Sequence, residues 1–321
     1  MKSRRWLSAL LACSALAGTA PSAAAAYPDR PVRMVVGIAP GGSTDTAARV
    51  IAAKLAERWG QPVVIDNRPG ADGSMAEELV ARATPDGYSM VVAYGSHNVN
   101  SFVMKLSFDP VTSFTPVIRM TNTPLVLVVN AASVPVKNFD EFIAYVRANP
   151  GKLNYGHGGE GTSPNLAMLF LMKATGIRIV PVAYKGMAPA TVSLVGNEIQ
   201  VMFGSPTVVV PHIATGRLVP LAITSSTRSR GLPNVPTVAE AAHLPDFSVD
   251  TWTGILVHSG TPRAVVSKIH DDVAAILQIP EVQKALAAQG FDVIGGSPEE
   301  FAEFSKKERA RLADLFGKAP R

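Results

Sequence analysis

Short apolar runs alternate with amphipathic segments along most of this chain. Residues 32–38 form a compact apolar run bounded by turn residues, which predicts a buried strand. The next segment repeats Ala47, Ile51, Leu55 and Trp59 every fourth residue and places charged residues on its other faces, which predicts a helix. Because strand and helix patterns go on alternating, we expect parallel sheets covered by helices.

The predicted elements fall into two α/β units and a tail. The first unit runs to about residue 98, and a strongly β-branched run at 125–129 opens a second unit that continues to residue 224. A Pro-rich link and a strand at 253–257 follow, and two amphipathic helices near 263–277 and 298–315 close the chain. The sequence therefore predicts two lobes.

Each lobe repeats the order of a strand, a glycine-containing loop and a helix. Ligands of open α/β sheets bind beyond the carboxyl ends of the strands. The loops at these ends are 39–45, 94–98, 156–164, 185–187 and 204–206. Because the loops come from both lobes, we expect a cleft between the lobes to bring them together.

The loop after the first strand carries Gly41 and Gly42 and leads directly into a helix. A glycine-bent turn into a helix start suits a carboxylate or phosphate, because the first backbone N–H groups of a helix have no internal partner. Ser43 and Thr44 are candidates to cap this helix and to donate to a ligand, and both roles can hold at once. Asp45 is expected to be structural, because its carboxylate would repel an anionic ligand.

The loop from Gly156 to Ser163 has the spacing of a phosphate-binding P-loop but lacks its lysine, because Thr162 stands there. A nucleotide phosphate would lose its main cation. A smaller oxyanion fits better, held by the Gly161 backbone and by the Thr162 and Ser163 hydroxyls. The alternative is a glycine-rich turn with one of the two hydroxyl residues as helix N-cap.

His97 and His157 lie in two of these loops and are candidate ligand donors. The six histidines show no metal-ligand spacing, so no metal site is expected. The sequence also shows no G-x-S-x-G elbow and no recognisable catalytic set. It therefore predicts a binding protein that needs no cofactor and is not an enzyme.

The first 26 residues read as a secretory signal peptide: a basic start, a short apolar stretch and an A-x-A cleavage site that ends at Ala26. Cys13 is the only cysteine, and the alternative that it is lipidated stays open. Of the 30 Lys and Arg residues 3 lie in this segment, which leaves 27 against 25 Asp and Glu. That small excess does not predict nucleic-acid binding.

The sequence resembles the extracytoplasmic solute-binding proteins of tripartite tricarboxylate transporters, known as Bug proteins. The resemblance runs from Tyr27 nearly to the end of the chain. It rests on the segments 27–31, 40–45, 60–64, 67–71, 85–88, 150–155, 184–190, 233–240 and 260–262.

The resemblance implies a type II periplasmic-binding-protein fold, with two Rossmann-like lobes joined by two crossover segments. Lobe 1 would comprise 27–124 plus 225–321, and lobe 2 would comprise 125–224. It implies a periplasmic monomer that binds a small carboxylate and delivers it to membrane permease subunits. The ligand-binding residues are then expected to be Gly41, Gly42, Ser43, Thr44, Ser96, His97, His157, Gly161, Thr162, Ser163, Gly186, Gly204, Ser205 and, near the hinge, Trp252.

Three positions depart from the family pattern. Gly204 stands where relatives commonly carry an acidic residue, Asn165 where they often carry histidine, and His157 where they usually carry a small hydroxyl residue. The missing acid favours a plain carboxylate over an amino acid. Two other functions stay open at this point: a periplasmic sensor that presents its ligand to a signalling receptor, and an exported α/β hydrolase.

Overall fold

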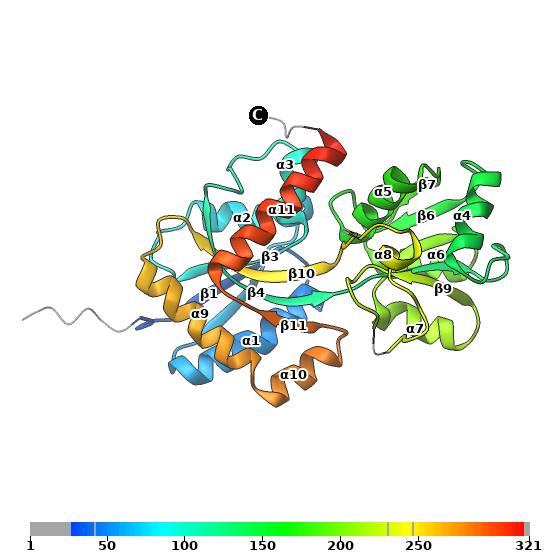
Figure 1. Ribbon diagram of the computed structural model, residues 1–321. Helices are drawn as coiled ribbons and strands as arrows, with labels where there is room; N and C mark the ends of the chain where they lie inside the picture. The colour runs from blue at the N-terminus through cyan, green and yellow to red at the C-terminus, as the bar shows by residue number, and fades with distance from the viewer. Residues whose placement is uncertain (1–26, 42, 230, 246, 318–321) are drawn as a thin grey trace, which may run out of the picture.

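The computed structural model describes residues 27–317 except 42, 230 and 246, and for Ser43 the backbone only. The predicted signal peptide over 1–26, its cleavage site and Cys13 lie outside the described residues. The chain forms two lobes side by side, each a sheet with helices packed against it (Figure 1). Within the described residues, no helix is both long and apolar enough to span a bilayer.

Lobe 1 is built on a six-stranded sheet with the order β11-β4-β10-β3-β1-β2. Its strands are β1 (Val32–Val36), β2 (Val63–Asn67), β3 (Ser89–Tyr94), β4 (Phe114–Thr123), β10 (Thr251–His258) and β11 (Asp292–Gly295). Its helices are α1 (Ser43–Trp59), η1 (Ala71–Gly73), α2 (Ser74–Ala81), α3 (Ser96–Val103), α9 (Arg263–Leu277), α10 (Pro280–Ala287) and α11 (Pro298–Phe316). Strands β1, β2 and β3 are parallel, whereas β10 runs antiparallel to β3 and β4.

Lobe 2 is built on a five-stranded sheet with the order β7-β6-β8-β5-β9. Its strands are β5 (Val126–Asn130), β6 (Asn154–His157), β7 (Val180–Ala183), β8 (Val201–Gly204) and β9 (Leu218–Ile223). Its helices are α4 (Phe139–Ala148), α5 (Ser163–Thr175), α6 (Met187–Val195), α7 (Pro206–Ala214) and α8 (Val238–Ala241). Strands β6, β7 and β8 are parallel.

Both sheets are buried on both faces, which explains the continuous apolar runs in the sequence. Met34 and Val36 of β1 pack in one core with α1 and α9, whereas Val35 packs in a second core with α2 and α11. In lobe 2 the alternate residues of β5 likewise divide between a core with α4 and α5 and a core with α6 and α7. A strand buried on both sides needs apolar residues at every position rather than at every second one.

The chain crosses between the lobes from β4 to β5 and returns before β10. We expected residues 225–249 to belong to lobe 1. Instead Val238, Phe247 and Val249 are buried in the lobe 2 core, and Ile223 of β9 bridges to Thr237. The Pro-rich composition of this segment gave no periodic pattern from which its packing partner could be read.

Lobe 1 also packs directly against lobe 2. Val99 of α3 and Leu312 of α11 are buried in the same apolar cluster as the α5 residues of lobe 2. Beside this contact, Lys173 Nζ of α5 donates to Asp314 Oδ2 of α11 at 2.8 Å. The C-terminal helix therefore reaches from one lobe into the core of the other.

Candidate functional site

The loops that follow the parallel strands of each lobe emerge at one edge of its sheet, and the two edges meet. A Cβ placed on Gly161 of lobe 2 would lie 3.3 Å from Asp72 Oδ2 and 3.7 Å from Ser96 Cβ of lobe 1. A Cβ on Gly95 of lobe 1 would lie 2.9 Å from Ser163 Oγ of lobe 2. The predicted meeting of strand-end loops from both lobes is therefore present in the structure.

On the lobe 1 side, Asp45 fixes the loop that opens α1. Its carboxylate accepts from Gly41 N at 2.8 Å, from Asn67 Nδ2 at 2.8 Å and from Arg49 Nε at 2.9 Å. Burial alone would raise the pKa of Asp45, but these hydrogen bonds and the Arg49 charge outweigh it and hold the pKa below its ordinary value. Asp45 is structural, as expected from its sequence position. Thr44 beside it is buried, while Gly42 and the Ser43 side chain are outside the description.

On the lobe 2 side, the first turn of α5 begins without a side-chain cap. Thr162 occupies the N-cap position, but its Oγ1 donates to Gly159 O at 2.7 Å and makes no capping hydrogen bond. Pro164, the second residue of α5, has no N–H, so the donors that lack a capping oxygen are the backbone N–H groups of Ser163 and Asn165. Ser163, the first residue of α5, is buried at the contact with Gly95.

His157 ends β6 on the face that α5 covers. Its ring contacts that of Tyr155 in a tilted arrangement, with the ring centres 5.6 Å apart, and the Tyr155 hydroxyl donates to Asn165 Oδ1 at 2.7 Å. Burial, with the Glu160 charge, raises the pKa of Tyr155 to about 12. Among the described residues His157 Nδ1 has no hydrogen-bond partner, although the side chain is buried. His157 thus lies at the strand end that the sequence indicated, with one ring nitrogen open.

The remaining lobe 2 candidates lie at the same sheet edge. Gly186 precedes α6 with φ 104° and packs against Gly158, where an added Cβ would lie 3.2 Å from its Cα. Gly204 ends β8 and Ser205 occupies the N-cap position of α7. Thr207, the second residue of α7, meets Gly290 of lobe 1, where an added Cβ would lie 2.8 Å from Thr207 Cγ2.

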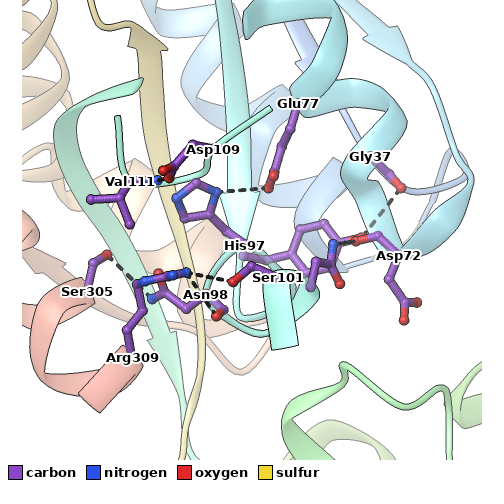
Figure 2. A network of polar contacts seen from close by, with 12 residues as sticks. Gly37, Asp72, Glu77, His97, Asn98, Ser101, Asp109, Val111, Ser305 and Arg309 are labelled. Carbon is purple, nitrogen blue, oxygen red and sulfur yellow. Dashed lines mark hydrogen bonds and ion pairs between the residues drawn. The ribbon is translucent and has the colours of Figure 1, made fainter. Parts of the chain in front are cut away.

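Two candidates lie elsewhere in lobe 1. The His97 ring contacts Phe114 edge-on, and its Nδ1 lies 3.1 Å from Glu77 Oε1 (Figure 2). The ring lines a separate pocket of lobe 1, whereas the neighbouring Ser96 faces lobe 2. The Trp252 ring is fully buried in the core beneath α11. Neither side chain takes the place expected from its loop or hinge position, because adjacent residues of an element point in different directions.

The sequence reasoning missed Asp72 and Asn100. Ala71 and Asp72 adopt left-handed φ values of 45° and 49°, and Asn100 Nδ2 donates to Asp72 O at 3.1 Å. This geometry directs the Asp72 carboxylate toward the Gly159–Gly161 backbone of lobe 2. Left-handed non-glycine residues leave no reliable mark in a sequence, although this loop ends a strand and contains two glycines.

The arrangement offers backbone amides and hydroxyls without a metal centre. Within the described part of the chain, no group of three His, Cys, Asp or Glu side chains is placed to hold a metal ion. The backbone and hydroxyl donors at the meeting edges suit an oxyanion, whereas the Asp72 carboxylate at the same contact would repel one and suits a ligand that also carries a donor.

Comparison with known proteins agrees with this geometry. Residues 47–319 match the tripartite tricarboxylate transporter family receptor, TctC. A UPF0065 protein from the tcbD-tcbE intergenic region of a Pseudomonas species is 37% identical over 95% of this chain and 92% of its own length. BugT of Bordetella pertussis is 33% identical over 92% of this chain and 91% of its own length.

Solved structures extend the similarity to the whole fold. Rpa4515 of R. palustris with adipate is 35% identical, with a TM-score of 0.80 over 92% of this chain and all of its own. MatC of Rhodopseudomonas palustris with bound malate is 34% identical, with a TM-score of 0.77 over 90% of this chain and all of its own. The periplasmic-binding-protein fold is confirmed, and this chain belongs to the tripartite tricarboxylate transporter receptor family.

Proposed function

We propose that this protein captures a small carboxylate between its two lobes in the periplasm and delivers it to the permease subunits of a tripartite transporter. The family is a receptor family, and two similar structures carry adipate and malate. In this proposal the chain acts as a monomer, after cleavage of the signal peptide behind Ala26.

The meeting of the two strand-end edges at the uncapped start of α5 supports this function best. Thr162 Oγ1 donates to Gly159 O and accepts no hydrogen bond from α5, and Pro164 has no N–H. The backbone N–H groups of Ser163 and Asn165 are therefore the first-turn donors left for an external acceptor. The positive end of the helix dipole adds to these donors. A carboxylate bound there would meet groups from both lobes, so binding would favour the closed arrangement.

The proposal predicts a ligand that stabilises the folded protein. Purified protein covering residues 27–321 is heated with mono-, di- and tricarboxylates, both aliphatic and aromatic. A ligand at a hundred times its dissociation constant adds about 2.7 kcal/mol to the free energy of unfolding, which raises the melting temperature. If no carboxylate of any of these classes raises the melting temperature, the proposal is wrong.

A matched pair of variants then locates the site. Thr162→Ala removes the hydrogen bond that shapes the loop at the start of α5, and Thr175→Ala removes one at the far end of the same helix, to Leu171 O. A hydrogen bond contributes about 0.5–1.5 kcal/mol, so Thr162→Ala should weaken binding by about 2- to 12-fold, while Thr175→Ala leaves it unchanged. Equal affinity of both variants in calorimetry would place the ligand elsewhere.

A further inference from the structure

Lobe 1 contains a pocket that the proposed carboxylate site does not use. It has a volume of about 260 Å³ and lies between α3, α11 and the segment that leads into β4. His97 and Asn98 of α3 line one side, and Ser305 and Arg309 of α11 line another (Figure 2). An apolar cavity of about 150 Å³ accommodates benzene, so this pocket has room for a substituted six-membered ring.

Most of the pocket wall is apolar and part of it is aromatic. Val111, Phe114, Pro116 and Leu256 supply this wall, and the Phe114 ring packs edge-on against His97. Val111 lines the pocket and keeps 57% of its surface exposed. A ring that filled the pocket would cover this side chain and remove apolar surface from water.

The charges at the pocket are cationic. Lys306 and Arg309 line it, and no acidic side chain is among its lining residues. Acidic side chains lie nearby. Glu308 accepts from Trp252 Nε1 at 3.1 Å, and Asp109 from Val111 N at 2.7 Å. Glu77 Oε1 lies 3.1 Å from His97 Nδ1, and Glu303 Oε2 lies 3.8 Å from Lys306 Nζ in an exposed ion pair. Lys306 and Arg309 are nevertheless the charged side chains that line the pocket itself, so they are the groups that a carboxylate entering it would meet.

The pocket is also lined by a buried polar atom that lacks a hydrogen-bond partner among the described residues. Asn98 is fully buried, and its Nδ2 donates to Glu308 Oε2 and, at 3.4 Å, to Ser305 Oγ. Among the described residues, its Oδ1 has no hydrogen-bond partner. A buried acceptor left unpaired costs about 1–3 kcal/mol, which a water held between Asn98 Oδ1 and a bound carboxylate would recover, since it donates to both.

From the apolar wall, the two cations and the unpaired acceptor, we propose that this pocket is a second binding site, for monocyclic aromatic carboxylates. The ring lies against Phe114 and Val111, and the carboxylate faces Lys306 and Arg309. This site is separate from the meeting edges of the lobes and does not depend on the function proposed for them.

Methyl NMR with benzoate as the probe tests this proposal. The signals of Val111 and Leu256 should shift and saturate with benzoate. Methyl benzoate, which has the same ring without the charge and without a hydrogen-bond donor, should bind at least threefold more weakly. Adipate, which has no ring, should leave these signals unchanged. No saturable shift of either signal up to about 10 mM benzoate would overturn the proposal.

A matched pair of variants on α11 shows where benzoate binds. Ala302 is exposed and lines the pocket, whereas Ala310 is exposed on the same helix and does not line it. Both tolerate a larger side chain because their Cβ atoms face solvent. Ala302→Phe should fill the pocket and weaken benzoate binding at least tenfold, and Ala310→Phe should not change it. Equal benzoate affinity of the two variants would overturn the proposal.

Discussion

A methyl group added at Gly161 should act on the closed arrangement of the lobes. Gly161 has a φ that other residues adopt freely, so Gly161→Ala does not strain lobe 2 itself. The new Cβ would instead lie 3.3 Å from Asn100 Oδ1, 3.3 Å from Asp72 Oδ2 and 3.7 Å from Ser96 Cβ, all in lobe 1. Only the approach of the two lobes brings these atoms against it.

The cost follows from how firmly those neighbours are held. Asn100 is fully buried and tied to the Asp72 carbonyl, and Asp72 sits in a left-handed backbone, so neither side chain gives way easily. Adding a methyl group to a well-packed region costs about 1–3 kcal/mol. The contacts at Gly161 are tight but do not clash severely, so we expect a cost at the lower end of this range. A penalty of about 1 kcal/mol on the closed arrangement lowers the affinity about fivefold.

Isothermal titration with the carboxylate found in the thermal screen measures this effect. Gly231→Ala is the control, because a Cβ there would meet only Ser229 Oγ at 3.7 Å and lies at no contact between the lobes. Without ligand, the melting temperature of Gly161→Ala should equal or exceed that of the wild type, since alanine lowers the conformational entropy of the unfolded chain. An affinity of Gly161→Ala within twofold of the Gly231→Ala value would refute a ligand site closed by this contact.

Three further substitutions test the framework around the site. Asp45→Asn should destabilise the protein at pH 7 by about 1.5–3 kcal/mol, the usual range for hydrogen bonds to a charged group. Because the folded pKa of Asp45 is lowered, its contribution is complete above the ordinary pKa of about 3.9 and disappears as the pH falls through the folded value. The difference between Asp45→Asn and wild type in urea unfolding should therefore shrink below pH 4, and a constant difference would contradict this. Leu312 belongs to a helix of lobe 1 and is buried in lobe 2. Leu312→Ala should lower the free energy of unfolding by about 2–5 kcal/mol, because it leaves a cavity. A loss below about 1 kcal/mol in the same urea assay would show that this contact is loose. Tyr155→Phe should lose about 0.5–1.5 kcal/mol with its bond to Asn165, and an unchanged unfolding midpoint would mean that water replaces this partner.

Where a strand is buried on both faces, its pattern was readable from the sequence. β1 and β5 are continuous apolar runs, and both were predicted as strands. β4 was not predicted, because Pro116, Arg119 and Asn122 interrupt its apolar positions, and its pairing with β10 and β11 is a tertiary property. α3 was read only as a loop, because its short sequence holds two asparagines, two serines and a histidine.

The candidate site was predictable at the level of loops but not of individual side chains. Ligand position at strand ends follows from topology, and the predicted loops 39–45, 94–98 and 156–164 do follow the ends of β1, β3 and β6. Which side chain enters the space depends on local φ and on rotation about the helix axis. For this reason His97 turned into lobe 1 and Asp72, which no motif marked, turned toward lobe 2.

The burial of Leu312 in lobe 2 also limits how the lobes can move apart. Rotation of lobe 2 about the two crossovers must either pull this side chain out of its apolar neighbours or slide α5 along α11. Pulling Leu312 out of this cluster would expose its aliphatic surface to water, at a free-energy cost of about 25 cal/mol for each Å². A small sliding movement of the packed helices keeps this surface covered. The lobes should therefore open by a shear displacement of short amplitude. A membrane partner that distinguishes the ligand-bound from the ligand-free receptor would then have to detect a lateral shift of one lobe rather than a large hinge opening.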